Sequence, residues 1–175
     1  GILLLFNKKT RWSAVILGIV GLVSVLTIPT LAPIKTELLA QDRSGQIRIS
    51  IWKETTELLK ERPILGAGLA SYSERIVPYH KKVNGENIEI FHHPHNIFLT
   101  MWVNVGMIGL AGFVLVLVWF YTTGFKSVDS RQSTVDKFLI ASMTTLLVTG
   151  LVDSPYIKND LSVLFWTLPM LLLLS

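Results

Sequence analysis

Residues 97–125, IFLTMWVNVGMIGLAGFVLVLVWFYTTGF, contain no charged side chain. This run is longer than the roughly 20 apolar residues that a helix needs to cross a bilayer. Three other apolar runs lie at residues 12–31, 138–152 and 161–175, and residues 1–6 (GILLLF) are typical of the end of a further helix. The sequence therefore predicts an all-α polytopic transmembrane helical bundle with about four crossings.

The composition favours a membrane protein and excludes several other classes. Hydrophobic residues make up 50% of the chain, charged residues 16%, and the mean hydropathy is +0.51. Soluble domains are nearer a quarter charged, and disordered, collagenous and coiled-coil chains have different compositions again. The chain has no cysteine, which excludes disulfide scaffolds, thiolate metal sites and cysteine nucleophiles.

The positive charges predict the orientation. Residues 7–11 (NKKTR) and 126–137 (KSVDSRQSTVDK) are short segments between apolar runs, and each is rich in Lys and Arg. Such segments favour the cytoplasm, so residues 32–96 and 153–160 are expected on the opposite face. We therefore interpret residues 1–175 as a single membrane domain with a large extracytoplasmic loop at 32–96. Because both ends are apolar, we expect it to be part of a longer protein.

An amphipathic helix is predicted within that loop, at residues 45–62 (GQIRISIWKETTELLKER). One side carries Ile51, Thr55, Leu58 and Leu59, at the spacing of a helix face. The opposite side is expected to carry mainly Lys53, Glu54, Glu57, Lys60 and Glu61. Arg48 and Trp52 are four residues apart and so share a face. Pro63 ends the helix, and residues 63–68 (PILGAG) form a turn.

Two sequence blocks carry a family resemblance. Residues 95–109, HNIFLTMWVNVGMIG, fit the pattern His-[Asn/Ser/Gln]-x9-Gly-x-x-[Gly/Thr/Tyr]. Upstream, Arg48 and Trp52 form Arg-x-x-x-Trp, followed about ten residues later by Pro-Ile-Leu-Gly-x-Gly at 63–68. In this order the blocks closely resemble the O-antigen ligase / O-antigen polymerase family of polytopic glycosyltransferases. The resemblance is clear from Arg48 to Gly109 and looser through Asp153 to the end.

The resemblance implies a reaction and its partners. Such proteins transfer a glycan from an undecaprenyl-diphosphate carrier to an acceptor hydroxyl at the outer face of the bacterial cytoplasmic membrane. The acceptor is lipid A core, a growing polysaccharide or a protein hydroxyl, and membrane lipids surround the enzyme. The family's site is metal-independent, so no cofactor and no metal are expected, and nucleic acid is not an expected partner. The family has further crossings and arginines upstream, so this segment alone is expected to be inactive.

The candidate catalytic residues are Arg48, His95 and Asp153. A diphosphate leaving group needs positive charge where negative charge develops, and the planar guanidinium of Arg48 suits phosphate oxygens. His95 is the expected base for the acceptor hydroxyl, since histidine titrates closest to neutral pH. Asp153, at the outer end of a later helix, is expected to meet His95 and support it. The candidate substrate-binding residues are Arg43, Trp52, Arg75, His93 and Asn96.

Each of these residues also has a purely structural interpretation. His95 can be a helix-entry residue, Arg48 can extend to the membrane surface, and Trp52 can be an interfacial anchor. His92, His93 and His95 are too crowded, with Pro94 between them, to favour one metal ion. Gly106 and Gly109 are interpreted as positions of close helix packing.

Two other functional classes remain open from the sequence. One is a membrane transporter, similar to proteins linked to inorganic carbon uptake. The other is a non-catalytic partner in polysaccharide export. Transporters usually place polar groups at the bilayer midplane, whereas the candidates here lie in an outer loop, which favours an enzyme.

Overall fold

The computed structural model describes residues 4, 6, 9–131, 134–154 and 159–174. Helices account for the regular structure of this part, and within it the only strand-like pairing is an isolated bridge between Val83 and Glu86. The all-α prediction is therefore confirmed. The helices are α2 (Arg11–Thr27), α3 (Ala32–Leu38), α4 (Arg43–Glu61), α5 (Tyr72–Arg75), α6 (Ile97–Arg131), α7 (Thr134–Gly150) and α8 (Asn159–Leu174), with 3-10 turns η1 (Pro29–Leu31) and η2 (Val77–Tyr79).

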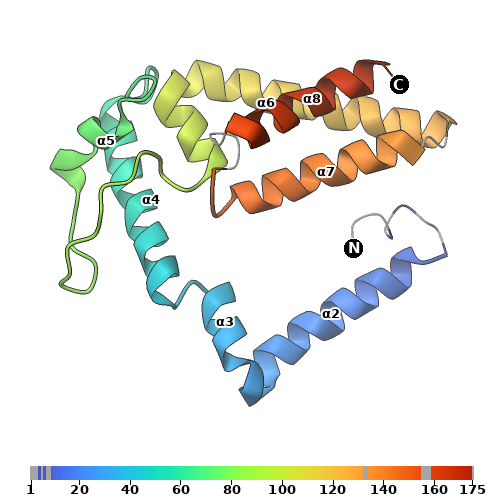
Figure 1. Ribbon diagram of the computed structural model, residues 1–175, viewed down its shortest axis with the longest axis horizontal. Coiled ribbons are helices and arrows are strands. Elements are labelled where there is room, and N and C mark those ends of the chain that lie inside the picture. Colours follow the sequence, from blue (N-terminus) through green and yellow to red (C-terminus); the bar gives the residue numbers. More distant parts are fainter. Residues whose placement is uncertain (1–3, 5, 7–8, 132–133, 155–158, 175) are drawn as a thin grey trace. The chain divides into compact units, whose positions relative to one another are not determined.

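The chain forms two compact units, Gly1–Gln46 and Ile47–Ser175. In the first unit, α2 ends at Thr27 and a 3-10 turn begins at Pro29. Proline cannot donate a backbone hydrogen bond, so the apolar run predicted at residues 12–31 is not one continuous helix. In the second unit, α7 and α8 lie alongside the long part of α6 (Figure 1), and the ring of Phe113 stacks on that of Phe165.

One described helix, Ile97–Val128 within α6, is long and apolar enough to cross a membrane. The bent pair Arg11–Thr27 and Pro29–Glu61 would provide a second span if it is counted as one. The apolar part of α8 is shorter than a full span. Of the four predicted crossings, α6 is thus the clear candidate, and the remaining crossings stay predictions.

Helix α6 is interrupted at Gly106, where φ is 69° and ψ is −176°. Its first turns run in a different direction from the rest of the helix (Figure 1). The interruption is filled by the turn at residues 63–68, which we call the PILGAG loop. Ile64 O accepts a hydrogen bond from the N–H of Met107 at 3.0 Å, and Val103 O accepts one from Ala67 at 2.7 Å.

The glycines of the two sequence blocks allow this close approach. A Cβ atom at Gly106 would fall on the carbonyl oxygen of Ile64, and one at Gly66 would fall on that of Val103. Both glycines also have a positive φ, which favours glycine over any other residue. The interpretation of Gly106 as a helix-packing position is therefore corrected: Gly106 breaks α6 and admits a loop.

The apolar face predicted for the loop helix is confirmed in α4. Ile51, Thr55, Leu58 and Leu59 are all buried. Glu54, predicted on the polar side, is also buried, with 3% of its surface exposed. The prediction for Glu54 is wrong because residues 80–88 cover this flank of α4. The sequence of α4 alone does not indicate that cover.

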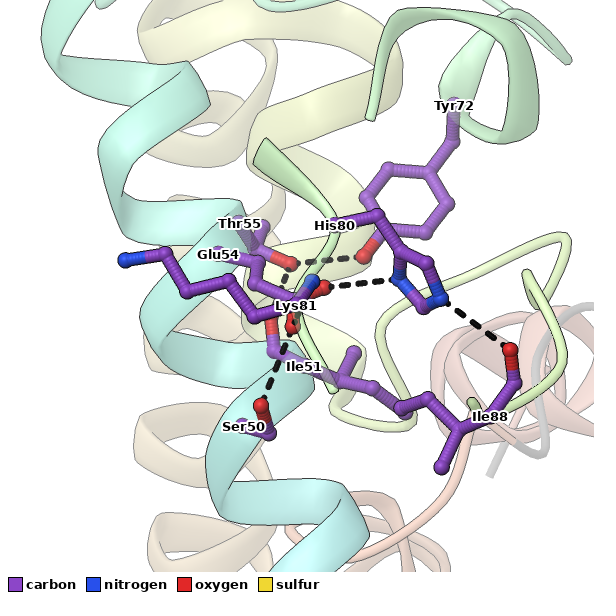
Figure 2. Close-up of polar contacts among 8 residues, drawn as sticks. All are labelled: Ser50, Ile51, Glu54, Thr55, Tyr72, His80, Lys81 and Ile88. Atoms are coloured by element: carbon purple, nitrogen blue, oxygen red, sulfur yellow. Dashed lines mark hydrogen bonds and ion pairs between the residues drawn. The ribbon is translucent and has the colours of Figure 1, made fainter. Parts of the chain in front are cut away.

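The buried carboxylate of Glu54 is surrounded by hydrogen-bond partners (Figure 2). It accepts hydrogen bonds from Ser50 Oγ at 3.0 Å and from the backbone N–H of Lys81 at 3.2 Å. The Nδ1 atom of His80 lies 3.2 Å from its second oxygen, and His80 Nε2 lies 3.0 Å from the carbonyl of Ile88. Since a buried carboxylate is costly unless it is paired, this network ties residues 80–88 to α4.

A second buried contact links α5 to α4. The hydroxyl groups of Tyr72 and Thr55 lie 2.8 Å apart, and both residues are buried (Figure 2). Burial raises the pKa of Tyr72 from 10.0 to about 12, although the hydrogen bond with Thr55 acts in the opposite direction. The neutral phenol is therefore preferred in the folded protein.

Tyr72 should make the protein sensitive to alkali. Because its folded pKa is raised, its contribution is fully present below pH 10 and is lost as the pH rises toward 12. The expected loss is on the order of 2–3 kcal/mol of unfolding free energy. Denaturant unfolding at pH 9 and pH 12 should therefore differ less in Tyr72→Phe than in the wild type. An equal loss in both proteins would contradict this assignment, because every other group of the chain is common to both.

Candidate active site

His95 lies in the short segment that enters α6. Its backbone φ is 49°, an uncommon value for a residue other than glycine. The next residue, Asn96, caps the helix: its Oδ1 accepts hydrogen bonds from the N–H groups of Phe98 and Leu99, both at 3.0 Å. The preceding Pro94 is fully buried. The position of His95 is therefore fixed from both sides.

Trp52 connects this segment to α4. Its Nε1 donates a hydrogen bond to the carbonyl of Pro94 at 2.9 Å, across 42 positions of sequence. Arg48 lies one helical turn before Trp52, on the same face of α4. The Arg-x-x-x-Trp block is thus held beside the His-Asn block by a specific hydrogen bond.

The end of α7 approaches the start of α6 from the other direction. Asn96 Nδ2 donates to the carbonyl of Leu151 at 2.9 Å, and the buried hydroxyls of Thr100 and Ser154 lie 2.7 Å apart. A Cβ atom at Gly150 would lie 3.0 Å from Cγ2 of Ile97, so the glycine lets the two helices come close. These contacts place Asp153 next to the segment that contains His95.

His95 and Asp153 meet in this arrangement, as the sequence predicted. His95 Nδ1 lies 3.4 Å from Asp153 Oδ1, and the same oxygen accepts the backbone N–H of Ser154 at 2.7 Å. The side chains are partly accessible, at 24% for His95 and 39% for Asp153. A proton on Nδ1 facing Asp153 leaves the lone pair of the imidazole on Nε2. The pair has the chemistry of an oriented general base.

His93 completes the cluster. Its ring centre is 4.4 Å from that of His95, and its Nδ1 accepts the backbone N–H of His95 at 3.3 Å. Potential ligand atoms of His93, His95 and Asp153 lie within 4.8 Å of one another. These three residues could therefore hold a metal ion, and Asp153 takes the place of His92 in this set.

The arginines differ in their placement. Arg48 is half-buried on α4, and it forms no hydrogen bond or ion pair with the residues that the structure describes. Its charge is available to a ligand. Arg75 is exposed on α5, and Arg43 begins α4 within the Gly1–Gln46 unit. No hydrogen bond or ion pair joins Arg75 to His95 in the described part of the chain. The roles of Arg43 and Arg75 as substrate-binding residues stay predictions.

Sequence reasoning missed the residues that support the site. A hydrogen bond between Thr100 and Ser154 joins α6 to the segment after α7. The contact of His80 with Glu54 anchors residues 80–88 to α4. None of these four residues is a defining position of a sequence motif, so the sequence alone does not single them out. The one available signal was Thr100, a hydroxyl in an apolar helix next to the His-Asn block, because polar groups in such helices usually find partners.

Comparisons with known proteins identify the family. Residues 1–114 match the family described as O-antigen ligase. This match includes Arg48, His95 and Gly106, but not Asp153. Over 98 residues the chain is 35% identical to a protein of Rickettsia conorii named "Putative polysaccharide ligase". The aligned region covers 54% of this chain and 23% of that protein, so the chain spans about a quarter of its relative's length.

No solved structure matches the chain significantly. The family match therefore rests on the sequence, and it covers the two blocks that the structure brings into contact. Family membership implies a membrane-associated protein of polysaccharide biosynthesis. The chain belongs to the O-antigen ligase family.

Proposed function

We propose that this protein is a glycosyltransferase that moves a glycan from an undecaprenyl-diphosphate carrier to an acceptor hydroxyl. The pairing of His95 with Asp153, 58 positions apart, carries the proposal. The pair lies beside α6, the helix that can span a membrane, and a lipid diphosphate is held at the membrane surface. An O-antigen ligase or polymerase reaction places its reacting groups at this level.

His95 acts on the acceptor in this proposal. Nε2 takes the proton of the acceptor hydroxyl as its oxygen forms the new bond to the anomeric carbon of the glycan. Asp153 holds the ring orientation and stabilises the imidazolium that forms. The bond from the anomeric carbon to the diphosphate breaks, and the lipid diphosphate leaves with the electron pair. General-base assistance of this kind typically contributes about 10²–10⁴ to the rate.

Arg48 acts on the donor. Negative charge grows on the diphosphate as it leaves, and a guanidinium placed there stabilises the transition state. Two observations support this role. Arg48 has no hydrogen-bond or ion-pair partner among the described residues, and it lies one helical turn from Trp52. His93, Trp52 and Asn96 are proposed to line the substrate site, and Arg43 and Arg75 to contact the glycan or phosphates.

The proposed setting is a polytopic helical bundle in the bacterial cytoplasmic membrane. Residues 32–96 face the periplasm or exterior. Acceptor candidates are lipid A core, a growing glycan and a protein hydroxyl.

A transfer assay tests the proposal directly. The full-length protein is reconstituted in vesicles and supplied with an undecaprenyl-diphosphate-linked glycan and an acceptor, with and without excess EDTA. We expect glycan transfer and release of the lipid diphosphate in both conditions. Transfer that EDTA abolishes and Zn²⁺ restores would assign His93, His95 and Asp153 to a metal site instead. Absence of transfer, with uptake of a small solute, would favour a transporter.

Replacing Arg48 by lysine should reduce both donor binding and turnover. Lysine keeps the charge but loses the planar fork that matches two phosphate oxygens. Donor affinity and the single-turnover transfer rate measure the two effects separately. Arg62→Lys, at an exposed position just after α4, is the matched control and should leave both values nearly unchanged. Wild-type donor affinity in Arg48→Lys would remove Arg48 from the diphosphate site.

A further inference from the structure

The geometry points to an additional membrane contact: residues 63–69 (PILGAGL), the PILGAG loop with Leu69, lie in the hydrocarbon edge of the bilayer. Three apolar side chains of this segment are exposed, at 61% for Ile64, 78% for Leu65 and 71% for Leu69. Such a cluster within one short loop is unusual on a surface that faces water. The sequence alone predicts that the whole 32–96 segment lies outside the membrane.

The exposed loop continues the apolar surface of α6. Hydrogen bonds from Met107 to Ile64 and from Ala67 to Val103 fix the loop beside the break in the helix. Met107 and Ile108 follow immediately and are 46% and 74% exposed. Residues 107–128 rise roughly 30 Å at 1.5 Å per residue, which equals the thickness of the hydrocarbon core. The span therefore begins at the break, and the loop lies at its end.

The backbone of the loop is suited to this depth. Irregular backbone is tolerated in a membrane only where the protein satisfies its polar groups. The carbonyl of Pro63 accepts Trp102 Nε1 at 2.7 Å, and Gly66 N–H donates to Arg62 O at 2.9 Å. Gly68 N–H joins Ala67 in donating to Val103 O, at 3.2 Å. These backbone groups are thus paired with protein atoms, while the side chains of Ile64, Leu65 and Leu69 are exposed.

Flanking residues limit how deeply the loop enters. Arg62 directly precedes it and is exposed. Trp102 is hydrogen-bonded to Pro63 of the loop. Tryptophan and arginine are both suited to the interface between headgroups and hydrocarbon. A loop of this length between such residues reaches the upper acyl chain and not the bilayer centre.

Depth-dependent fluorescence quenching tests the inference. The chain has no cysteine, so Leu65→Cys and, separately, Leu69→Cys accept a single NBD label. The labelled proteins are reconstituted in phosphatidylcholine/phosphatidylglycerol vesicles that carry nitroxide at a shallow or a deep acyl position. Leu115→Cys, 67% exposed within α6, is the membrane control. Asn84→Cys, in an exposed turn, is the aqueous control.

Both loop labels should emit at shorter wavelength than the Asn84 label. They should be quenched several-fold more by shallow than by deep nitroxide, while the Leu115 label shows the opposite preference. Water-like emission at both loop positions would overturn the inference. So would blue-shifted emission without quenching by either lipid, because a protein surface would then cover the loop.

Discussion

Replacing His95 by alanine is expected to lower the rate of glycan transfer by a factor on the order of 10²–10⁴. The imidazole is the group proposed to remove the acceptor proton, and Asp153 lies 3.4 Å from its Nδ1. Donor affinity should change little, since the diphosphate is assigned to Arg48. Single-turnover transfer at saturating donor, with donor binding measured separately, distinguishes the two effects.

The neighbouring histidines are controls for this substitution. His92 is exposed, and His93 stacks near His95 with a ring-centre separation of 4.4 Å. His92→Ala and His93→Ala should both be much milder than His95→Ala. If His93→Ala abolishes transfer while His95→Ala leaves it near normal, the base is His93. If all three variants remain active, the histidine segment has no catalytic part and His95 is only a helix-entry residue.

Replacing Gly106 by alanine is expected to destabilise the fold severely. The new Cβ would meet the carbonyl oxygen of Ile64, and the backbone has φ of 69° and ψ of −176°. Backbone strain and overpacking each cost about 1–3 kcal/mol. Their sum is a large part of the stability of a typical domain. The thermal midpoint in detergent, followed by size-exclusion chromatography, should fall sharply.

Two glycines separate the causes of that loss. Gly85 has φ of +83°, and no atom lies within 4 Å of the place that a Cβ would take, so Gly85→Ala carries conformational strain without a clash. Gly112 is helical with open space around it, so Gly112→Ala should be neutral or slightly stabilising. A Gly106→Ala protein as stable as Gly112→Ala would mean that the loop does not occupy the break in α6.

The sequence predicted those features that depend on local pattern. The period of the loop helix correctly identified Ile51, Thr55, Leu58 and Leu59 as its buried face, because α4 has one side against the core. The distance along the chain between His95 and Asp153 also allowed their meeting to be foreseen. It required only that one helical hairpin, α6 with α7, return the chain to the end at which α6 begins.

Features that depend on a distant partner were not predictable in this way. Glu54 was assigned to the polar side because α4 alone gives no indication that His80 and Lys81 cover it. The two glycine-containing blocks were recognised separately, but neither contains information that one fits into a break in the other. The close contacts at Gly66 and Gly106 depend on tertiary structure, and no helical or strand periodicity in the sequence indicates them.

A double-mutant cycle between His95 and Asp153 tests the central claim most directly. The claim is that these two side chains act as one acceptor-activating unit, with Asp153 orienting His95. Residues that act as a unit are strongly non-additive in turnover. Single-turnover transfer is measured for the wild type, His95→Ala, Asp153→Asn and the double variant. The account predicts that the double variant is no slower than His95→Ala alone. A double variant slowed by the product of the two single effects would show that the residues act independently, and would contradict it.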